Sequence, residues 1–172
     1  NDDDNYCLLY GGLYDWNTVM NGEASSNSNP SGVQGICPDG WHVPSDAEWS
    51  ELTDFLINTY VYVNEENVGN KLKSCRQILS PLGGDCNTSV APLWNSNSIN
   101  YGSNDFGFSA FPGGRRNTNE TYEYNGSFGY WWSCTENPST NAWRIQMSYN
   151  SGTVYRYDSN KSRGLSVRCL QD

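Results

Sequence analysis

The stretch GICPDGWHVPSDAEWSELTDFL, residues 35–56, decides the fold, because it holds the strongest helix start in the chain. Ser45 is followed three residues later by Glu48. This spacing is a capping box, in which each side chain accepts a hydrogen bond from a backbone N–H at the start of a helix. The apolar residues that follow recur at intervals of three and four, which places them on one face. We therefore expect a helix from Ser45 whose core-facing residues are Trp49, Leu52, Phe55 and Leu56.

The composition favours short strands joined by turns, since the 172 residues include 17 Gly and 12 Tyr but only 17% charged residues. A chain of this length forms one core, so we expect a single domain over residues 1–172. The net charge of −9 argues against nucleic acid and anionic membranes as partners, because both need a basic surface. No run of about 18 apolar residues occurs, so we expect no membrane span. An Asn at position 1 favours a mature or excised fragment without its targeting segment.

The N-terminal half predicts short elements around the main helix. Residues 1–6 (NDDDNY) form a polar tail. Residues 7–16 predict a strand, a bend at Gly11-Gly12 and a second extended segment. Asn64 is an N-cap candidate followed by acidic residues, which predicts a short second helix over residues 65–73.

Alternating apolar and polar residues predict three adjacent antiparallel strands near the C-terminus, at 142–149, 153–157 and 164–169. Loops at 136–141 and 158–163 flank them. In the first strand the expected inward residues are Trp143, Ile145 and Met147, and the expected outward residues are Arg144, Gln146 and Ser148.

The tryptophans divide into two groups. We expect Trp41, Trp49 and Trp143 in the core. Trp131 and Trp132 are adjacent in a strand and point to opposite sides of it, so at most one can form a stacking platform.

The six cysteines indicate disulfides rather than a zinc site, because the chain has no CxxC pair and one histidine. Three disulfides place the protein outside the cytoplasm. Spacing alone leaves 15 connectivities for six cysteines. Cys75 and Cys86 are close enough to close a short loop, so we pair them.

Five blocks carry a family resemblance: GICPDGWHVPSDAEW at 35–49, GNKLKS at 69–74, FGFSAFPGG at 106–114, GYWWSCT at 129–135 and GLSVRC at 164–169. Together they resemble the Fibrobacter succinogenes major paralogous domain, a family of secreted or surface-attached bacterial domains. The resemblance implies a fold similar to the C-type lectins and the formylglycine-generating enzymes.

The resemblance also bears on the other cysteines and on the C-terminal face. The family-like blocks carry Cys37 and Cys169, which implies a bond between them. Cys7 and Cys134 stand where the family pattern does not require cysteine, so we expect them to bond each other. Some members are targets of diversity-generating retroelements, which rewrite Asn codons near the C-terminus, and residues 144–162 have the expected mix of Tyr, Ser, Asp and Asn.

Residues 136–163 form the candidate recognition region, because its outward positions are rich in Tyr, Asn and Ser. Recognition surfaces use Tyr for contact area at small entropy cost and Asn and Ser for adaptable hydrogen bonds. The alternative is that these residues only fill exposed strand positions and turns. The candidate ligand-binding residues are Arg144, Gln146, Ser148, Tyr149, Asn150, Tyr155, Tyr157, Asp158 and Asn160, with Tyr122, Tyr124 and Asn125 in the preceding loop.

For catalysis the sequence offers little. His42 lies between Trp41 and Val43 just before a helix cap, which favours a hydrogen-bonded structural role, and no GxSxG element is present. Formylglycine-generating enzymes use two copper-binding cysteines close together near the C-terminus, whereas Cys134 and Cys169 are far apart. We therefore expect no catalytic residues. Paired carboxylates for glycoside hydrolysis stay an alternative.

The resemblance to C-type lectins raises the question of calcium. Those proteins hold calcium and sugar through an EPN or QPD triplet and a WND triplet, whereas this chain has ENP at 136–138 and no WND. We expect no metal site and no cofactor. A structural calcium ion held by Asp105 or by the carboxylates of the tail stays an alternative.

We therefore expect an α+β domain of C-type-lectin-like fold, with two helices packed on a twisted antiparallel sheet, loop-rich and disulfide-bonded. The leading hypothesis is a non-catalytic recognition or adhesion domain, secreted or on a bacterial cell surface, that binds a glycan or a protein through its Tyr/Asn-rich C-terminal face. The alternative is a structural subunit of an extracellular assembly formed by self-association. A formylglycine-generating-like or carbohydrate-active enzyme is a further alternative.

Overall fold

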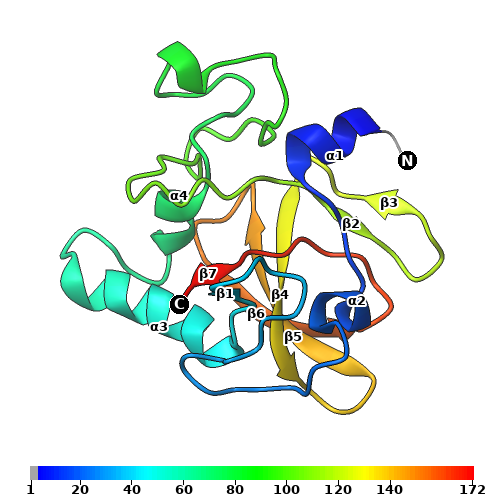
Figure 1. Cartoon of the computed structure of the whole chain (residues 1–172). Coiled ribbons are helices and arrows are strands. Elements are labelled where there is room, and N and C mark those ends of the chain that lie inside the picture. Colours follow the sequence, from blue (N-terminus) through cyan, green and yellow to red (C-terminus); the bar gives the residue numbers. More distant parts are fainter. Residues whose placement is uncertain (1–3) are drawn as a thin grey trace.

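The computed structural model describes residues 4–172, which form an α+β architecture of short helices and small antiparallel sheets (Figure 1). The helices are α1 (Asp4–Tyr10), α2 (Trp16–Met20), α3 (Asp46–Thr59) and α4 (Val68–Leu72), with one 3₁₀ turn, η1 (Gly84–Cys86). The strands are β1 (Trp41–His42), β2 (Arg115–Arg116), β3 (Tyr122–Glu123), β4 (Phe128–Glu136), β5 (Asn141–Ser148), β6 (Tyr155–Asn160) and β7 (Leu170–Gln171). They pair as a central β4–β5–β6 sheet, a β2–β3 hairpin and a β1–β7 pair.

Helix α3 begins where the sequence predicts. Ser45 Oγ accepts a hydrogen bond from the N–H of Glu48, and the Glu48 carboxylate accepts one from the N–H of Ser45. Trp49 and Leu56 are buried, as expected, but Phe55 is 57% exposed. At about 100° per residue, Phe55 lies roughly 120° around the helix axis from Trp49, so it turns away from the sheet. The prediction that Phe55 belongs to the core-facing side of the helix is therefore wrong.

The first part of the chain is helical, contrary to the predicted tail and strand. Residues 1–3 of the predicted tail lie outside the described residues, and Asp4–Tyr10 forms α1. Tyr6 and Tyr10 stack one turn apart, with ring centroids separated by 5.8 Å. An aromatic pair at this spacing stabilises a helix. The run of apolar residues before Gly11 is too short for its pattern to distinguish a helix from a strand.

The second helix is shorter than predicted. Helix α4 covers only Val68–Leu72 of the expected 65–73. The Asn64 side chain accepts a hydrogen bond from the N–H of Glu66, so it forms a local turn instead of capping the helix. Val68 and Leu72, the apolar pair, are both buried.

The central sheet confirms two of the three predicted C-terminal strands. β5 pairs antiparallel with both β4 and β6. β6 continues to Asn160, into the predicted loop 158–163, because Asn141 at the start of β5 pairs with Asn160. The predicted strand 164–169 is absent from the described residues. Gly164, Leu165 and Ser166 make only isolated bridges, and the chain then leaves the sheet to reach the cystine at Cys169.

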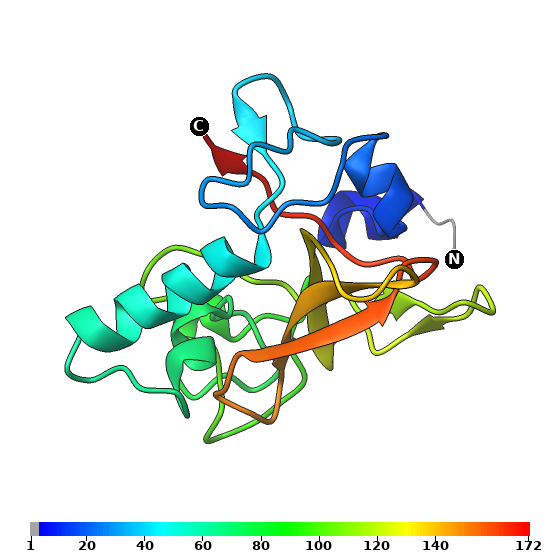
Figure 2. The same cartoon turned by 90° about the horizontal axis from the view of Figure 1, so that it is seen from below.

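Apolar clusters cover both faces of β4. Trp132 packs with Trp16 of α2 on one face, and Trp131 packs with Trp49 of α3 on the other. Figure 2 shows α2 on one side of the sheet and α3 with α4 on the opposite side. The expectation that Trp131 and Trp132 face opposite ways is therefore confirmed, and both are buried.

Two tryptophans predicted in the core are not fully buried. Trp41 is 38% exposed on the short strand β1. Trp143 is half-buried, because β5 places it towards β6, where the Arg156 guanidinium lies 3.8 Å from its ring centroid. An arginine over an indole ring covers the apolar surface without excluding water from the charge.

Two disulfides form as predicted, Cys37–Cys169 and Cys75–Cys86. The predicted third pair does not form. Cys134 is buried in β4, where its Sγ lies 3.4 Å from the carbonyl oxygen of Ser26, whereas Cys7 is exposed on α1. The β4 strand places the Cys134 side chain in the buried cluster that includes Trp16 and Trp132, whereas Cys7 lies at the surface.

Candidate functional site

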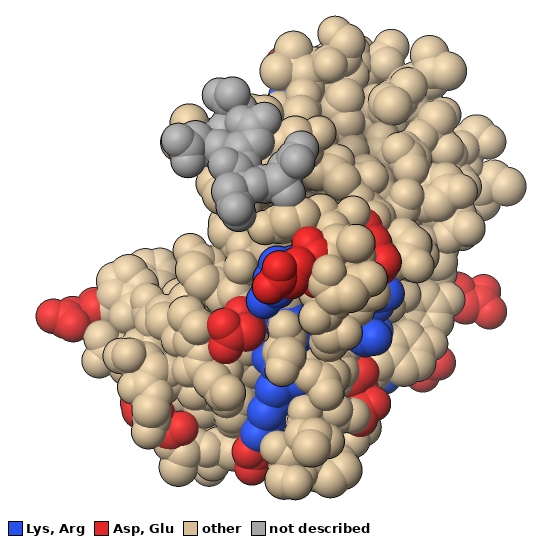
Figure 3. All heavy atoms as spheres, turned by 90° about the vertical axis from the view of Figure 1, so that its right-hand side faces the viewer, with Lys and Arg blue, Asp and Glu red and all other residues tan. Residues whose placement is uncertain are grey.

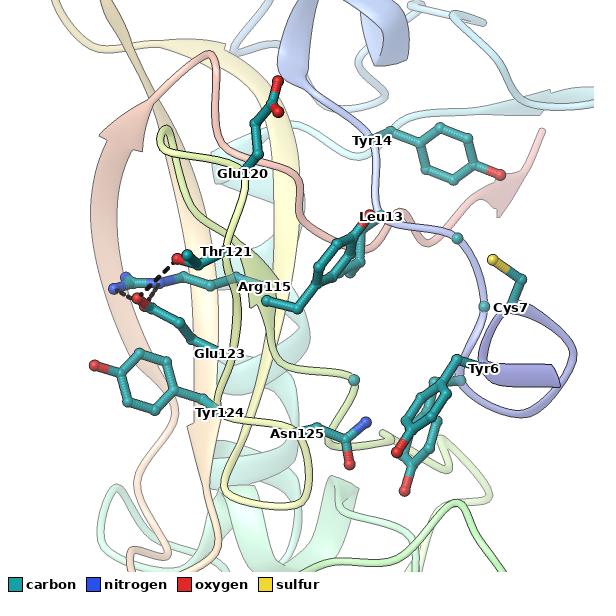
Figure 4. Close-up of a pocket in the computed structure, with 15 residues that line it drawn as sticks. Tyr6, Cys7, Leu13, Tyr14, Arg115, Glu120, Thr121, Glu123, Tyr124 and Asn125 are labelled. Atoms are coloured by element: carbon teal, nitrogen blue, oxygen red, sulfur yellow. Dashed lines mark hydrogen bonds and ion pairs between the residues drawn. The ribbon is translucent and has the colours of Figure 1, made fainter. Parts of the chain in front are cut away.

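A groove of about 850 Å³ lies between the N-terminal segment and the β2–β3 hairpin. Five tyrosines line it, and we call it the tyrosine groove. Figure 4 shows Tyr6, Cys7 and Tyr14 on one side of it and Arg115, Glu123 and Tyr124 on the other. The five tyrosines are Tyr6, Tyr10, Tyr14, Tyr122 and Tyr124.

The N-terminal wall depends on helix α1. The stack of Tyr6 on Tyr10 fixes both rings, and the Tyr10 hydroxyl accepts a hydrogen bond from the N–H of Leu93. Tyr14, which follows the glycine bend, is 39% exposed, and its backbone pairs with Leu165 beside the sheet. The wall is thus attached at both ends to the rest of the fold.

The opposite wall is the β2–β3 hairpin, in which Arg115 pairs directly with Glu123. The Arg115 guanidinium binds the Glu123 carboxylate through Nη2 at 3.0 Å and Nε at 3.3 Å, and it holds the pKa of Glu123 below its usual value. Gly114 precedes the strand at φ +66°, and a Cβ there would lie 2.2 Å from the Glu123 carbonyl oxygen. Only glycine fits this close approach.

Four of the predicted site residues share one face of the central sheet. Arg144 pairs across the strands with Tyr157, and Gln146 pairs with Tyr155. Directly opposite residues of an antiparallel pair lie on the same face. The rings of Tyr155 and Tyr157 stack with centroids 5.8 Å apart. This part of the predicted face is therefore assembled.

Arginine and tyrosine side chains alternate from this face to the hairpin. The Arg144 guanidinium lies 5.4 Å from the ring centroid of Tyr157 and 4.9 Å from that of Tyr130. Arg115 lies 5.8 Å from Tyr130 and 5.0 Å from Tyr124. These are cation–π distances. The row joins the C-terminal face to the tyrosine groove, because Arg115 and Tyr124, at its far end, also line the groove.

Two residues predicted to face outward are buried. Arg144 is 7% exposed, and Ser148 is 3% exposed with its hydroxyl bonded to Asn150 Oδ1. The alternation along β5 was assigned correctly, but the sequence did not show that both faces of the sheet are covered. Ser148 therefore belongs to the interior and not to a ligand-binding surface.

The remaining predicted residues lie elsewhere. Tyr149 packs against the cluster around Trp49, and Asp158 lies on the opposite face of the sheet from Tyr157, where it accepts a hydrogen bond from Asn141 at 2.8 Å. Asn150 and Asn160 are exposed, and the Asn160 side chain accepts a hydrogen bond from the N–H of Ser162. The predicted set is thus split over two faces and their turns.

The sequence missed half of the tyrosine groove. Tyr6, Tyr10 and Tyr14 were assigned to a tail and a strand, whereas Tyr122, Tyr124 and Asn125 were predicted. The available signal was the four-residue spacing of Tyr6 and Tyr10, which places two rings on one side of a helix.

His42 is buried between two carboxylates. Its Nε2 lies 2.8 Å from Glu48 Oε1, and its Nδ1 lies 2.6 Å from Asp172 Oδ1. Burial lowers the pKa of His42, but the hydrogen bonds to Asp172 and Glu48 outweigh it and hold the pKa above its usual value. Glu48 also caps α3, so His42 connects the main helix to the β1–β7 pair. The predicted structural role agrees with this geometry.

Residues 4–172 contain no group of three or more His, Cys, Asp or Glu side chains placed to hold a metal ion. Asp105, one of the predicted oxygen donors, forms an ion pair with Lys71 at 3.0 Å. The side chains of the tail carboxylates at positions 2 to 4 lie outside the part of the chain that the structure describes. A calcium ion stays a prediction that these contacts do not support.

The sequence model of the Fibrobacter succinogenes major domain matches residues 1–171. The chain belongs to this family. A search of curated proteins and a search of solved structures each find no match. Within residues 4–172 of this Fibrobacter succinogenes major domain, no helix is long and apolar enough to cross a membrane.

Proposed function

We propose that this Fibrobacter succinogenes major domain is a non-catalytic recognition domain of C-type-lectin-like fold, exported from a bacterial cell, and that it binds glycans in the tyrosine groove. The gathering of five tyrosines around one groove of about 850 Å³ carries the proposal. Ligand sites are typically concave, roughly 300–1,000 Å³ in volume, and lined by aromatic side chains with a few polar groups.

The side chains of the groove suit a sugar. A pyranose ring has an apolar face that packs on an aromatic ring, and hydroxyl groups at its rim that need hydrogen-bond partners. A tyrosine offers both a ring and a hydroxyl group. Tyr14 and Tyr124 are 39% and 45% exposed, and Asn125 and Glu120 add polar atoms between them. The groove therefore combines stacking surfaces with donors and acceptors.

The two disulfides support an extracellular location, since such bonds persist in oxidising compartments. In Cys37–Cys169 the bond joins residues 132 positions apart, so it is part of the folded scaffold. None of the four bonded cysteines lines the groove.

The test is an array of neutral and acidic oligosaccharides, followed by calorimetry on each one that binds. Tyr14→Ala and Tyr122→Ala should each weaken binding at least tenfold, because each removes a ring from the groove. Tyr62→Ala is the matched control, since Tyr62 is 53% exposed and lies outside the groove. An array without binders, or binders that both groove variants retain at full affinity, would overturn the proposal.

A second candidate function, a subunit of an extracellular assembly, is favoured by a different surface. Leu79 and Leu82 are 72% and 49% exposed on the loop that the Cys75–Cys86 bond closes, and Val90, which follows that loop, is 61% exposed. This loop projects from the rest of the fold (Figure 1). Exposed aliphatic groups in one place are typical of protein contacts. Sedimentation velocity should then show association that Leu79→Asp abolishes, and a strictly monomeric wild type would exclude it.

A further inference from the structure

Three arginines gather around Tyr130 and Ser159, and we call them the arginine cluster: Arg115, Arg144 and Arg163. Arg144 and Arg115 lie over the Tyr130 ring at 4.9 and 5.8 Å. Arg144 Nε and Arg163 Nη1 both donate to the hydroxyl oxygen of Ser159, at 2.6 and 3.4 Å. One neutral oxygen thus serves two cations.

The charges of the cluster are not balanced. Among the described residues Arg115 has a carboxylate partner, Glu123, whereas Arg144 donates only to the neutral acceptors Ser159 and Gln146. Arg163 Nε is buried without any hydrogen-bond partner. A buried charge without a counter-charge costs free energy. Two guanidinium groups are therefore left without an anion in a chain whose net charge is −9.

Electrostatic effects agree with this arrangement. The pKa of Arg144 is lowered to about 10, mainly by burial; the like charges of Arg115 and Arg163 contribute to this lowering, whereas Tyr130 and Tyr157 oppose it. Burial raises the pKa of the Tyr130 hydroxyl group, and the positive charges of the three arginines partly offset this rise. An anion placed among the three guanidinium groups would relieve their mutual repulsion.

The cluster borders the tyrosine groove, with Arg144 buried and with Arg115 and Arg163 half-buried. Tyr157, 47% exposed, borders it on the sheet, and Tyr124, 45% exposed, borders it on the hairpin. Figure 3 shows Lys and Arg side chains in a line on the side of the molecule that carries the hairpin, with Asp and Glu at its margins. Arg115 lines the groove as well. A chain of sugars in the groove can therefore extend over the cluster.

We propose that the arginine cluster binds an anionic substituent, a sulfate or a carboxylate, of an acidic polysaccharide whose neighbouring sugar occupies the tyrosine groove. The planar fork of a guanidinium group matches the oxygens of both anions. Arg163 is half-buried, and its Nε is a guanidinium nitrogen for which the fold supplies no acceptor. This inference rests on the proposed function and adds the chemical class of the ligand.

The test is calorimetry with three oligosaccharides of equal length: a sulfated one, an oligouronate and a neutral one. At least one acidic oligosaccharide should bind at least tenfold more tightly than the neutral one, and the two acidic probes distinguish sulfate from carboxylate. Arg163→Gln should remove that difference, and Arg163→Lys should restore only part of it, because a lysine lacks the fork. Equal affinity for acidic and neutral probes would overturn the inference.

The matched control is Arg168→Gln. Arg168 is also partly buried without a carboxylate partner, but it lies over Phe108 in the cluster on the other face of the sheet. The Arg168→Gln variant should keep the full preference for acidic probes. Arg144→Gln is a poorer test because Arg144 is buried in the fold. An Arg163→Gln protein that loses no more affinity than Arg168→Gln would contradict a specific site.

Two further measurements, the effect of sulfate on Tm and calorimetry with oligoglutamate, separate this inference from the proposed function. Inorganic sulfate, compared with chloride at equal ionic strength, should raise the Tm of the wild type but not that of Arg163→Gln. If neutral and acidic sugars bind equally in the groove, the proposed function stands and the inference fails. If sulfate acts through Arg163 but only an acidic peptide such as oligoglutamate binds, the polysaccharide class is wrong and the glycan function fails with it.

Discussion

Lys73 lies against Trp94 in the interior, with its Nζ 5.5 Å from the indole centroid, and both side chains are fully buried. Its ammonium group donates to the carbonyl oxygens of Asn100, Ser148 and Ser151. Burial lowers the pKa of Lys73 to about 7, whereas the three acceptors favour its charged form. One side chain thus holds two loops against the end of β5.

Lys73→Met should destabilise the domain by about 3 kcal/mol, because it keeps the apolar stem but leaves three carbonyl groups without their donor. Urea unfolding gives the measurement, as a lower midpoint at unchanged slope. Lys71→Met is the matched control, since Lys71 forms only a partly exposed ion pair with Asp105 and should cost less than about 1 kcal/mol. Equal losses in the two variants would show that the buried contacts of Lys73 contribute nothing extra.

Stability should fall as the pH rises through the folded-state pKa of His42. That pKa lies above its usual value, so between the unfolded and folded values the native state binds more protons than the unfolded state. The stabilisation from His42 is therefore complete below the ordinary histidine pKa of about 6.5 and is lost at higher pH. Tm should decrease from pH 6 to pH 8.5 in the wild type. His42→Gln should decrease less over the same range, and parallel curves for the two proteins would refute the linkage.

Native protein should contain two thiols of very different reactivity. Cys7 is exposed, whereas burial raises the pKa of Cys134 to about 11 and shields it from reagents. A thiol reagent should modify one residue in the native state and two after unfolding, and Cys7→Ser should abolish the fast reaction. Absence of any free thiol in unfolded, unreduced protein would restore the Cys7–Cys134 bond that the sequence suggested.

The two disulfides should differ in their effect on stability. In the chain-entropy account, Cys37–Cys169, with a separation of 132 residues, contributes about 5 kcal/mol, and Cys75–Cys86, with a separation of 11, contributes about 3 kcal/mol. Replacement of each pair by serine, followed by urea unfolding, tests the order. A larger loss for Cys75–Cys86 would mean that the short loop, rather than the long one, limits stability.

The sequence predicted the elements whose causes are local. The capping box of Ser45 and Glu48 marks α3, and the alternation around Ile145 marks β5. It failed where the cause is tertiary. Residues 164–169 alternate like a strand, but only the first three form bridges, and each is an isolated bridge to a different segment: Gly164 to Arg116, Leu165 to Tyr14 and Ser166 to Trp131. Alternation of apolar and polar residues cannot show whether a neighbouring strand is long enough to pair with the whole segment.

The candidate site was predicted in part for the same reason. Tyr155 and Tyr157 lie on the expected face because register follows from alternation. The position of Arg144 depends on Tyr130 of the neighbouring strand, whose ring also lies against Arg115 from the hairpin, and both are distant from Arg144 in the sequence. The tyrosine groove depends on α1 folding back beside that hairpin. Local sequence patterns predict neither the contact of Arg144 with Tyr130 nor the position of α1 beside the hairpin.

The bond between Cys37 and Cys169 determines how the domain would carry mechanical load. Tension applied at Asp172 first meets the two-residue pairing of β7 with β1 and then a covalent link to Cys37. In a domain held at its N-terminal end, the covalent path from Cys37 runs back along residues 36 to 4, so it bypasses β4, β5 and β6. A pull on that end would leave the faces that carry Tyr157 and the hairpin undistorted.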